Sequence, residues 1–302
     1  MKHVTSYKIS KYVVILFIVL SVGTYWGCQK ENPVNPTSST TVIDDAAASV
    51  ATAIGANNGG ALDQIGDIAT ITSAVGLGNE AGAILNKYSA DSAFGAVTKS
   101  YDSTTGWWTL TLSRHRTGDF GSAEFNRVYE YQFLDKDGGF QKYWLTGTDT
   151  AYSIHFIIAS GSGELQTLHI AHHLVSLSGE WLVTGTNTHV ITINTVTGGD
   201  YHRVASDTIT GENAVRTLNN TLTMKFIGVM VPRGGRLHLV SEVSGTITGT
   251  YHADITFSSG SLYVEKTIDK TFTITLGGDG SCSIDMGGRR FLANLTLGEI
   301  RR

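Results

Sequence analysis

From Trp107 onward, hydrophobic and polar residues alternate with the period of two that is typical of half-buried β-strands. The run WWTLTLSRHR, for example, places Trp108, Leu110 and Leu112 on one face. Glycine-rich turns such as TGGD, SSGS and GGDG separate many of the ten or so runs of this kind. The pattern therefore predicts an antiparallel β domain over residues 101–302, built as a large sheet, a sandwich or a partly closed barrel.

One stretch of this domain has the pattern of a β-hairpin. Tyr129, Tyr131 and Phe133 share a face, and the DKDGG sequence at 135–139 supplies the turn. The turn begins like a calcium-binding loop, but its later positions lack the glycine and the final glutamate that such a loop requires. We therefore interpret this sequence as a hairpin turn and predict no metal there.

The segment before the β domain has a helical period instead. In IDDAAASVATAIG the apolar residues fall near one helical face, and Asp44 and Asp45 are predicted to cap its start. NNGG interrupts this pattern, and ALDQIGDIATITSAVG then repeats the helical spacing. We predict a helical hairpin and connector over residues 42–100, which packs on one face or end of the sheet as a cover or as a partner-binding element. The fold class is thus mainly β with a short helical segment.

The first 27 residues have the layout of an export signal. Lys2, Lys8 and Lys11 make the start basic, and an uncharged run follows from Tyr12 to Gly27. The strongly apolar part of this run is nine residues long, whereas a membrane-spanning helix needs roughly 20. A removable signal is therefore favoured over a permanent transmembrane helix.

This segment resembles the signal peptide of bacterial lipoproteins. Gly27-Cys28 matches the end of the lipobox of that family, while Tyr25 and Trp26 depart from the aliphatic and small residues usual before it. The resemblance implies that residues 1–27 are removed and that Cys28 is lipidated. It covers about a tenth of the chain and implies nothing about the folded domain.

The sequence after Cys28 is suited to a tether. QKENPVNPTSSTT is polar and contains two of the three prolines in the chain, a composition that cannot bury enough surface to fold. Residues 28–41 are therefore predicted to be flexible. The residue after Cys28 is Gln29 and not aspartate. By the resemblance to lipoproteins, this implies sorting to the outer membrane. We expect a cell-envelope protein whose partner is the membrane, held through its lipid anchor.

The amino-acid composition narrows the class of protein further. Charged residues make up only 16%, and there are 38 threonines and 35 glycines, a balance that favours a secreted β protein. Residues 1–27 hold three lysines and no acid, so the remaining chain has seven more acidic than basic residues. Nucleic acid is not an expected partner, because binding phosphates requires clustered Lys and Arg.

The best candidate metal ligands are the histidines of HIAHH, namely His169, His172 and His173. On a strand, His169 and His173 point to one side and His172 to the other. The first and last are then about 13 Å apart at ~3.3 Å per residue, which is too far to share a zinc ion bound at about 2 Å. We predict solvated or hydrogen-bonding histidines, no metal and no cofactor.

No catalytic residue can be assigned from the sequence. A G-x-S-x-G nucleophile motif is not present. Cys282 would need a neighbouring base to act as a nucleophile, and a buried structural cysteine is the simpler interpretation. Lipidation of Cys28 would leave Cys282 without a disulfide partner. The protein is therefore not expected to be an enzyme.

The expected function is that of a binding or structural β domain tethered to a membrane. Its ligand-binding residues are unknown, but aromatic side chains are candidate contacts if they do not fill the core: Trp107, Trp108, Tyr129, Tyr131, Trp144 and Trp181. Two alternatives remain open. One is a carrier or sensor of an apolar ligand held in a cavity between helices and sheet, and the other is an enzyme without a recognisable motif. An envelope protein is a further possible partner.

Overall fold

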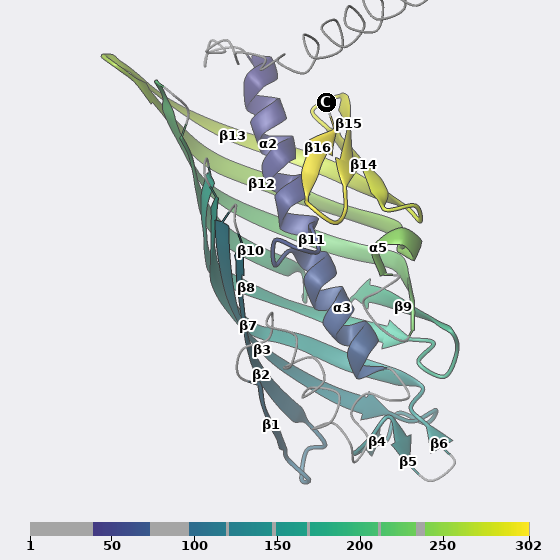
Figure 1. Ribbon diagram of the computed structural model, residues 1–302. Coiled ribbons are helices and arrows are strands. Elements are labelled where there is room, and N and C mark those ends of the chain that lie inside the picture. The colour runs from purple at the N-terminus through teal and green to yellow at the C-terminus, as the bar shows by residue number, and fades with distance from the viewer. Residues whose placement is uncertain are drawn as a thin grey trace, which may run out of the picture. The chain divides into compact units, whose positions relative to one another are not determined.

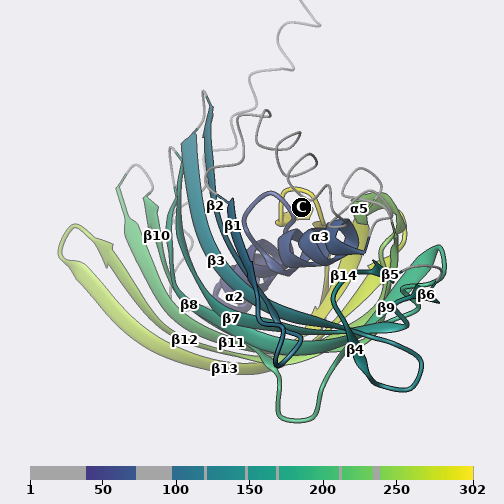
Figure 2. The same ribbon diagram turned by 90° about the horizontal axis from the view of Figure 1, so that it is seen from below.

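The computed structural model describes residues 39–72, 97–118, 121–146, 149–167, 170–210, 213–233 and 239–301. These residues belong to one compact unit, Pro36–Arg302. Within it, a large and strongly curved antiparallel sheet holds two helices on its concave face (Figures 1 and 2). The predicted signal, Cys28 and nearly all of the predicted tether lie outside the described residues.

The helices are α2 (Ser39–Ile54), α3 (Ala61–Ile71) and the short α5 (Leu239–Glu242). The strands are β1 (Val97–Tyr101), β2 (Trp108–Gly118), β3 (Gly121–Leu134), β4 (Phe140–Gln141), β5 (Leu145–Thr146), β6 (Asp149–Thr150), β7 (Ser153–Thr167), β8 (Ile170–Thr184), β9 (Val190–Thr195), β10 (Tyr201–Thr210), β11 (Val215–Pro232), β12 (Ser244–Ser259), β13 (Leu262–Gly277), β14 (Ser281–Met286), β15 (Arg289–Asn294) and β16 (Glu299–Arg301).

Fourteen of these strands form one sheet, and the mainly β fold class is confirmed. Its order is β1-β2-β3-β7-β8-β10-β11-β12-β13-β14-β15-β16, with β4 beside β3 and with β9 between β8 and β11. All of its pairings are antiparallel, and the ladders join strands that are close in sequence. Of the three architectures predicted, the single large sheet is therefore the one that forms, with more strands than expected.

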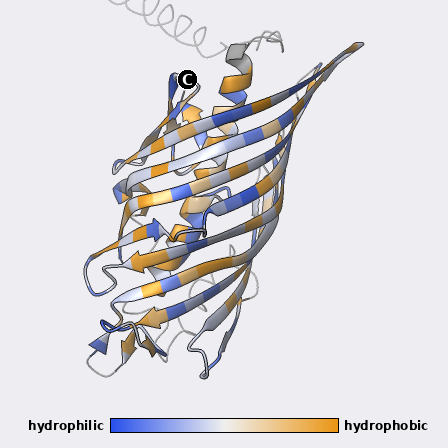
Figure 3. Cartoon of the chain, turned by 180° about the vertical axis from the view of Figure 1, so that it is seen from behind, coloured by the Kyte–Doolittle hydropathy of each residue, from blue (hydrophilic) through white to orange (hydrophobic). Residues whose placement is uncertain are grey.

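The predicted alternation of hydrophobic and polar residues sets the two faces of this sheet. Leu110 and Leu112 of β2, and Tyr129, Tyr131 and Phe133 of β3, all point to the concave side and are buried. Along the long strands, hydrophobic and hydrophilic residues alternate (Figure 3). Because the helices cover only the concave face, the other face stays polar, as is usual for antiparallel sheets.

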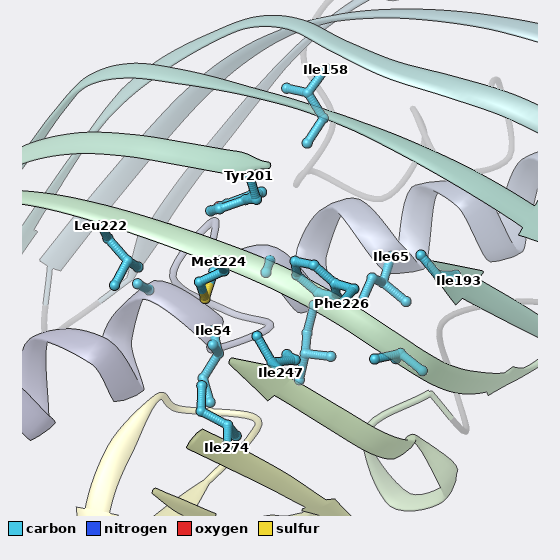
Figure 4. Packing of buried hydrophobic residues seen from close by; sticks show 14 of the residues in the cluster. Ile54, Ile65, Ile158, Ile193, Tyr201, Leu222, Met224, Phe226, Ile247 and Ile274 are labelled. Carbon is cyan, nitrogen blue, oxygen red and sulfur yellow. The ribbon is translucent and has the colours of Figure 1, made fainter. Parts of the chain in front are cut away.

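The core lies between the two long helices and the concave face. Ile54 of α2 and Ile65 of α3 lie in one cluster with Met224 and Phe226 of β11 and Ile247 of β12 (Figure 4). All five side chains are almost completely buried. The expectation that the helical segment packs on one face of the sheet is thus confirmed.

The predicted helical hairpin is wrong in its geometry, because α3 continues along roughly the same direction as α2 (Figure 1). The turn between them packs closely against the sheet: Gly59 has φ +63°, and a Cβ there would lie 2.7 Å from the ring of Phe125. The long concave face offers both helices apolar surface end to end, so neither helix needs the other as its main partner.

The helical segment also begins earlier than predicted. Because α2 starts at Ser39, Asp44 and Asp45 lie inside the helix and do not cap it. They bind arginines of the sheet instead: Asp44 pairs with Arg289, and Asp45 with Arg216 at 2.8 Å. The capping prediction failed because the helix also includes Ser39–Ile43, so both aspartates lie beyond its first turn.

The boundary predicted at residue 101 also moves, since β1 begins at Val97. Residues 73–96, which include most of the predicted connector, lie outside the described residues. Within the described ranges, no helix combines the length and the apolar character needed to cross a bilayer.

Candidate functional site

The predicted histidines divide as expected for a strand. His172 and His173 lie on opposite faces of β8, the first 3% exposed and the second with its side chain 58% exposed near Glu164, while His169 is not among the described residues. In the part of the chain that the structure describes, no three His, Cys, Asp or Glu side chains converge as metal ligands would.

The candidate contact aromatics lie mostly in the core. Trp107 is half-exposed, with its ring 5.1 Å from that of His155. The other five are buried: Trp108, Tyr129, Tyr131, Trp144 and Trp181. Of these six residues, only Trp107 is therefore half-exposed.

The other two predicted features have plain structural roles. In the DKDGG turn, the Asp135 carboxylate accepts the backbone N–H groups of Asp137 and Gly139, both at 2.8 Å, and the interpretation as a turn is confirmed. Cys282 is buried in β14, and this burial raises the pKa of its thiol to about 12. Such a thiol stays protonated at neutral pH and is a poor nucleophile.

Sequence reasoning missed a buried polar network between α3 and the concave face. Its first part is Arg114, which follows Leu112 on the inner face of β2. The guanidinium binds both Asp63 and Asp67 of α3, which are four residues apart and so share one helix face. Tyr129 of β3 donates a hydrogen bond to Asp67 at 2.8 Å. These contacts fix α3 against β2 and β3.

The second part of the network joins β8, β10 and β11. His172 lies 2.5 Å from Asp207, and Arg203 donates to the other ring nitrogen of His172 at 2.6 Å. Asn220 donates to the second oxygen of Asp207 at 2.9 Å. Because Arg203 can only donate, His172 must accept at Nε2 and carry its proton at Nδ1, which makes the imidazole neutral.

The third part ties the turn between the helices to the sheet. Arg127 of β3 is 1% exposed, and one Nη2 N–H donates to the carbonyl of Gly59 at 2.9 Å. Its Nη1 donates to the carbonyls of Asn126 and Ser162, both at 2.9 Å. Gln64 of α3 also donates to Gly59, at 3.0 Å. Arg127 and Gln64 thus hold the turn through its backbone carbonyl group.

The network is balanced in charge and has no free base. Its buried charged groups are three arginines and three aspartates, which fits a neutral His172. Both ring nitrogens of His172 are occupied, so this histidine cannot take a proton from a substrate without breaking a contact. The network is suited to fixing the helices in one position on the sheet, a specificity role known for some buried polar groups.

Two tyrosines of β3 give a matched test of this network. Replacing Tyr129 by phenylalanine should lower the free energy of unfolding by about 1.5–3 kcal/mol, because Asp67 loses a hydrogen bond. The same change at Tyr131 should cost close to nothing, since its buried hydroxyl has no hydrogen-bond partner among the described residues. Chemical denaturation of both variants checks this, and equal losses would contradict the assignment.

Stability should also depend on pH through His172. Burial lowers the pKa of this imidazole below its ordinary value of 6.5; the charges of Arg203 and His173 act in the same direction, and Asp207 opposes them. A lowered pKa means that the unfolded chain binds the proton more readily. The stabilisation that the folded chain gains from neutral His172 is therefore complete above about pH 6.5 and is lost as the pH falls below this value.

We expect the free energy of unfolding to fall from pH 7 to pH 5.5, and the slope to shrink in His172→Gln. Asp269 raises the pKa of the exposed His252, which changes the stability with pH in the opposite direction. The chain with His172 and the His172→Gln variant are therefore best compared with His252→Gln present in both. An unchanged slope in His172→Gln would show that other groups cause it.

A second feature is a break in the sheet between β7 and β8. Residues 159–162 and 175–178 lie opposite each other without ladder pairing. The neighbouring ladders shift register at the same level, between Val128 and Tyr129 on one side and between Val204 and Ala205 on the other. Such paired bulges bend a sheet strongly and are common beside binding sites.

A pocket of about 420 Å³ lies at this break, within the range of small-molecule sites. The side chains that line it on the polar face include Ser160, Ser162, Ser176 and Ser178. The sequence carries a signal for this site, because SGSGE in β7 and SLSGE in β8 repeat one pattern of small residues.

Comparison of the chain with protein families, curated proteins and solved structures found no match.

Proposed function

We propose that this protein is a lipid-anchored component of the bacterial cell envelope, attached through Cys28, whose β domain has a binding or structural role. The observation that carries the proposal is the order of segments along the chain. A basic start, an apolar run, Gly27-Cys28 and a polar stretch precede the compact unit, which begins at Pro36. Cys28 lies only eleven residues before the start of α2 at Ser39, so the anchor would hold the domain close to a membrane surface.

The buried network supports a binding or structural role more than a catalytic one. It fixes α3 and the turn at 55–60 on the sheet, and its single histidine has both ring nitrogens engaged. A rigid platform of this kind can present a polar face without any cofactor. The pocket between β7 and β8 gives that face a place for a small ligand.

The carrier alternative gains no support from the contact between the helices and the sheet. A carrier would need an apolar space of several hundred Å³ there. That contact is instead occupied by buried side chains such as Phe226, Met224 and Ile65 (Figure 4). We therefore propose that any ligand of this domain binds elsewhere than between the helices and the sheet.

Lipid labelling in bacteria tests the anchor. Cells that express the full chain are grown with radioactive palmitate, and the membrane and soluble fractions are compared. We expect label in the membrane-bound protein, and loss of both label and membrane attachment in Cys28→Ala. The matched control is Cys282→Ala, which removes the other cysteine and should keep both. Label that persists in Cys28→Ala would rule out this anchor.

A further inference from the structure

Two lysines lie beside one aromatic cluster at the β1 end of the sheet. The ammonium of Lys99 in β1 lies 4.2 Å from the centre of the Trp108 ring. That of Lys142, just after β4, lies 5.1 Å from the centre of the Tyr101 ring and 5.2 Å from that of Tyr143. The rings themselves touch, since the centres of Tyr101 and Trp108 are 4.8 Å apart. Both ammoniums thus flank a single aromatic surface.

These two positive charges have no negative partner in the described part of the chain. Lys99 is half-buried, and neither lysine forms an ion pair there. Burial, followed by the charge of Lys142, lowers the pKa of Lys99 to about 8. The two charges repel each other and Lys99 is partly out of water, so a bound anion would stabilise both ammoniums.

The cluster is also held in place before any ligand arrives. The indole N–H of Trp108 donates to the backbone carbonyl of Lys142 at 2.7 Å. Gln141 donates to the carbonyl of Tyr143 at 2.7 Å, and β4 is paired with β3. The segment that carries Lys142 is therefore fixed beside β2 and β3, which reduces the entropy lost on binding.

We propose that Lys99 and Lys142 bind the oxyanion group of a ligand, a phosphate or a carboxylate, between them on the aromatic surface. An oxyanion can accept hydrogen bonds from both ammoniums and cancel their repulsion. This inference rests on the binding role proposed above, because it names the class of ligand that the domain binds. It does not use the lipid anchor, so palmitate labelling and the experiment below can fail independently.

Calorimetric titration of the full chain tests the site, with sodium phosphate and sodium acetate added separately at constant ionic strength. At least one of the two anions should bind saturably, and the one that binds identifies the phosphate or the carboxylate class. Binding should weaken about tenfold or more in Lys142→Gln, because one of the two charges is lost. Lys142 is exposed, so this variant should fold normally. Lys136→Gln is the matched control: Lys136 lies in the nearby turn with its side chain 74% exposed, and binding should not change.

Acylation of lysines gives a second readout. At pH 8 and with limiting reagent, Lys99 should react first, since an ordinary lysine has a pKa of about 10.4. The bound anion favours the charged form, so it should slow the reaction of Lys99 but not that of Lys136. The proposal is overturned if neither anion binds saturably, or if Lys142→Gln and Lys136→Gln bind the anion equally well.

Discussion

Replacing Arg114 by methionine should lower the free energy of unfolding by about 3–5 kcal/mol. The change removes the cation that Asp63 and Asp67 share, and a buried charge that loses its ion-pair partner is costly. Urea denaturation at neutral pH measures the loss as a lower midpoint with an unchanged slope. Adding Asp63→Asn and Asp67→Asn to this variant should recover part of the lost stability, because two buried negative charges are then removed.

A surface pair provides the control for this prediction. Arg290 binds Asp285 at 2.8 Å, but both side chains are well exposed to water. Exposed ion pairs contribute little to stability, so Arg290→Met should shift the midpoint far less than Arg114→Met. If the two variants lose the same stability, the network does not hold α3 on the sheet.

Replacing Trp181 by alanine should also cost about 3–5 kcal/mol. Trp181 is completely buried, and its ring centre lies 6.0 Å from those of Phe156 and Tyr201 and 4.8 Å from that of Phe226. Removing the indole leaves a cavity among rings that three other strands supply. Chemical denaturation measures the loss.

Two further variants separate cavity formation from other causes. In Trp181→Phe the loss should be clearly smaller, because an aromatic ring stays in place. This change also removes a buried indole N–H that has no acceptor in the part of the chain that the structure describes. Trp107→Ala removes a half-exposed indole and should also cost less. A loss in Trp181→Ala no greater than that in Trp107→Ala would show that the aromatic cluster does not stabilise the sheet.

Much of the fold followed from the period of the sequence. The alternation of Trp108, Leu110 and Leu112 predicted an inner face, and all three are buried. The direction of α3 did not follow, since periodicity gives the faces of a helix but not the path of the turn before it. The shortest strands were missed because pieces such as β4 and β5, two residues each, have no measurable period.

The polar features were harder to predict for a physical reason. Arg114, Arg127 and Arg203 stand at inner-face positions of their strands, which is a readable signal, but their partners are far away in the sequence. Asp63 is 51 residues from Arg114, and only the folded sheet brings them together. Lys99 and Lys142 reach the same aromatic cluster for the same reason, through the pairing of β1 with β2, of β2 with β3 and of β3 with β4.

The mass of the intact protein, extracted from bacterial membranes with detergent, tests the lipid anchor most directly. The account predicts a chain that begins at Cys28 and carries added mass from acyl groups on that residue. A chain that begins at Lys30, or an uncleaved chain with a free Cys28 thiol, would contradict it.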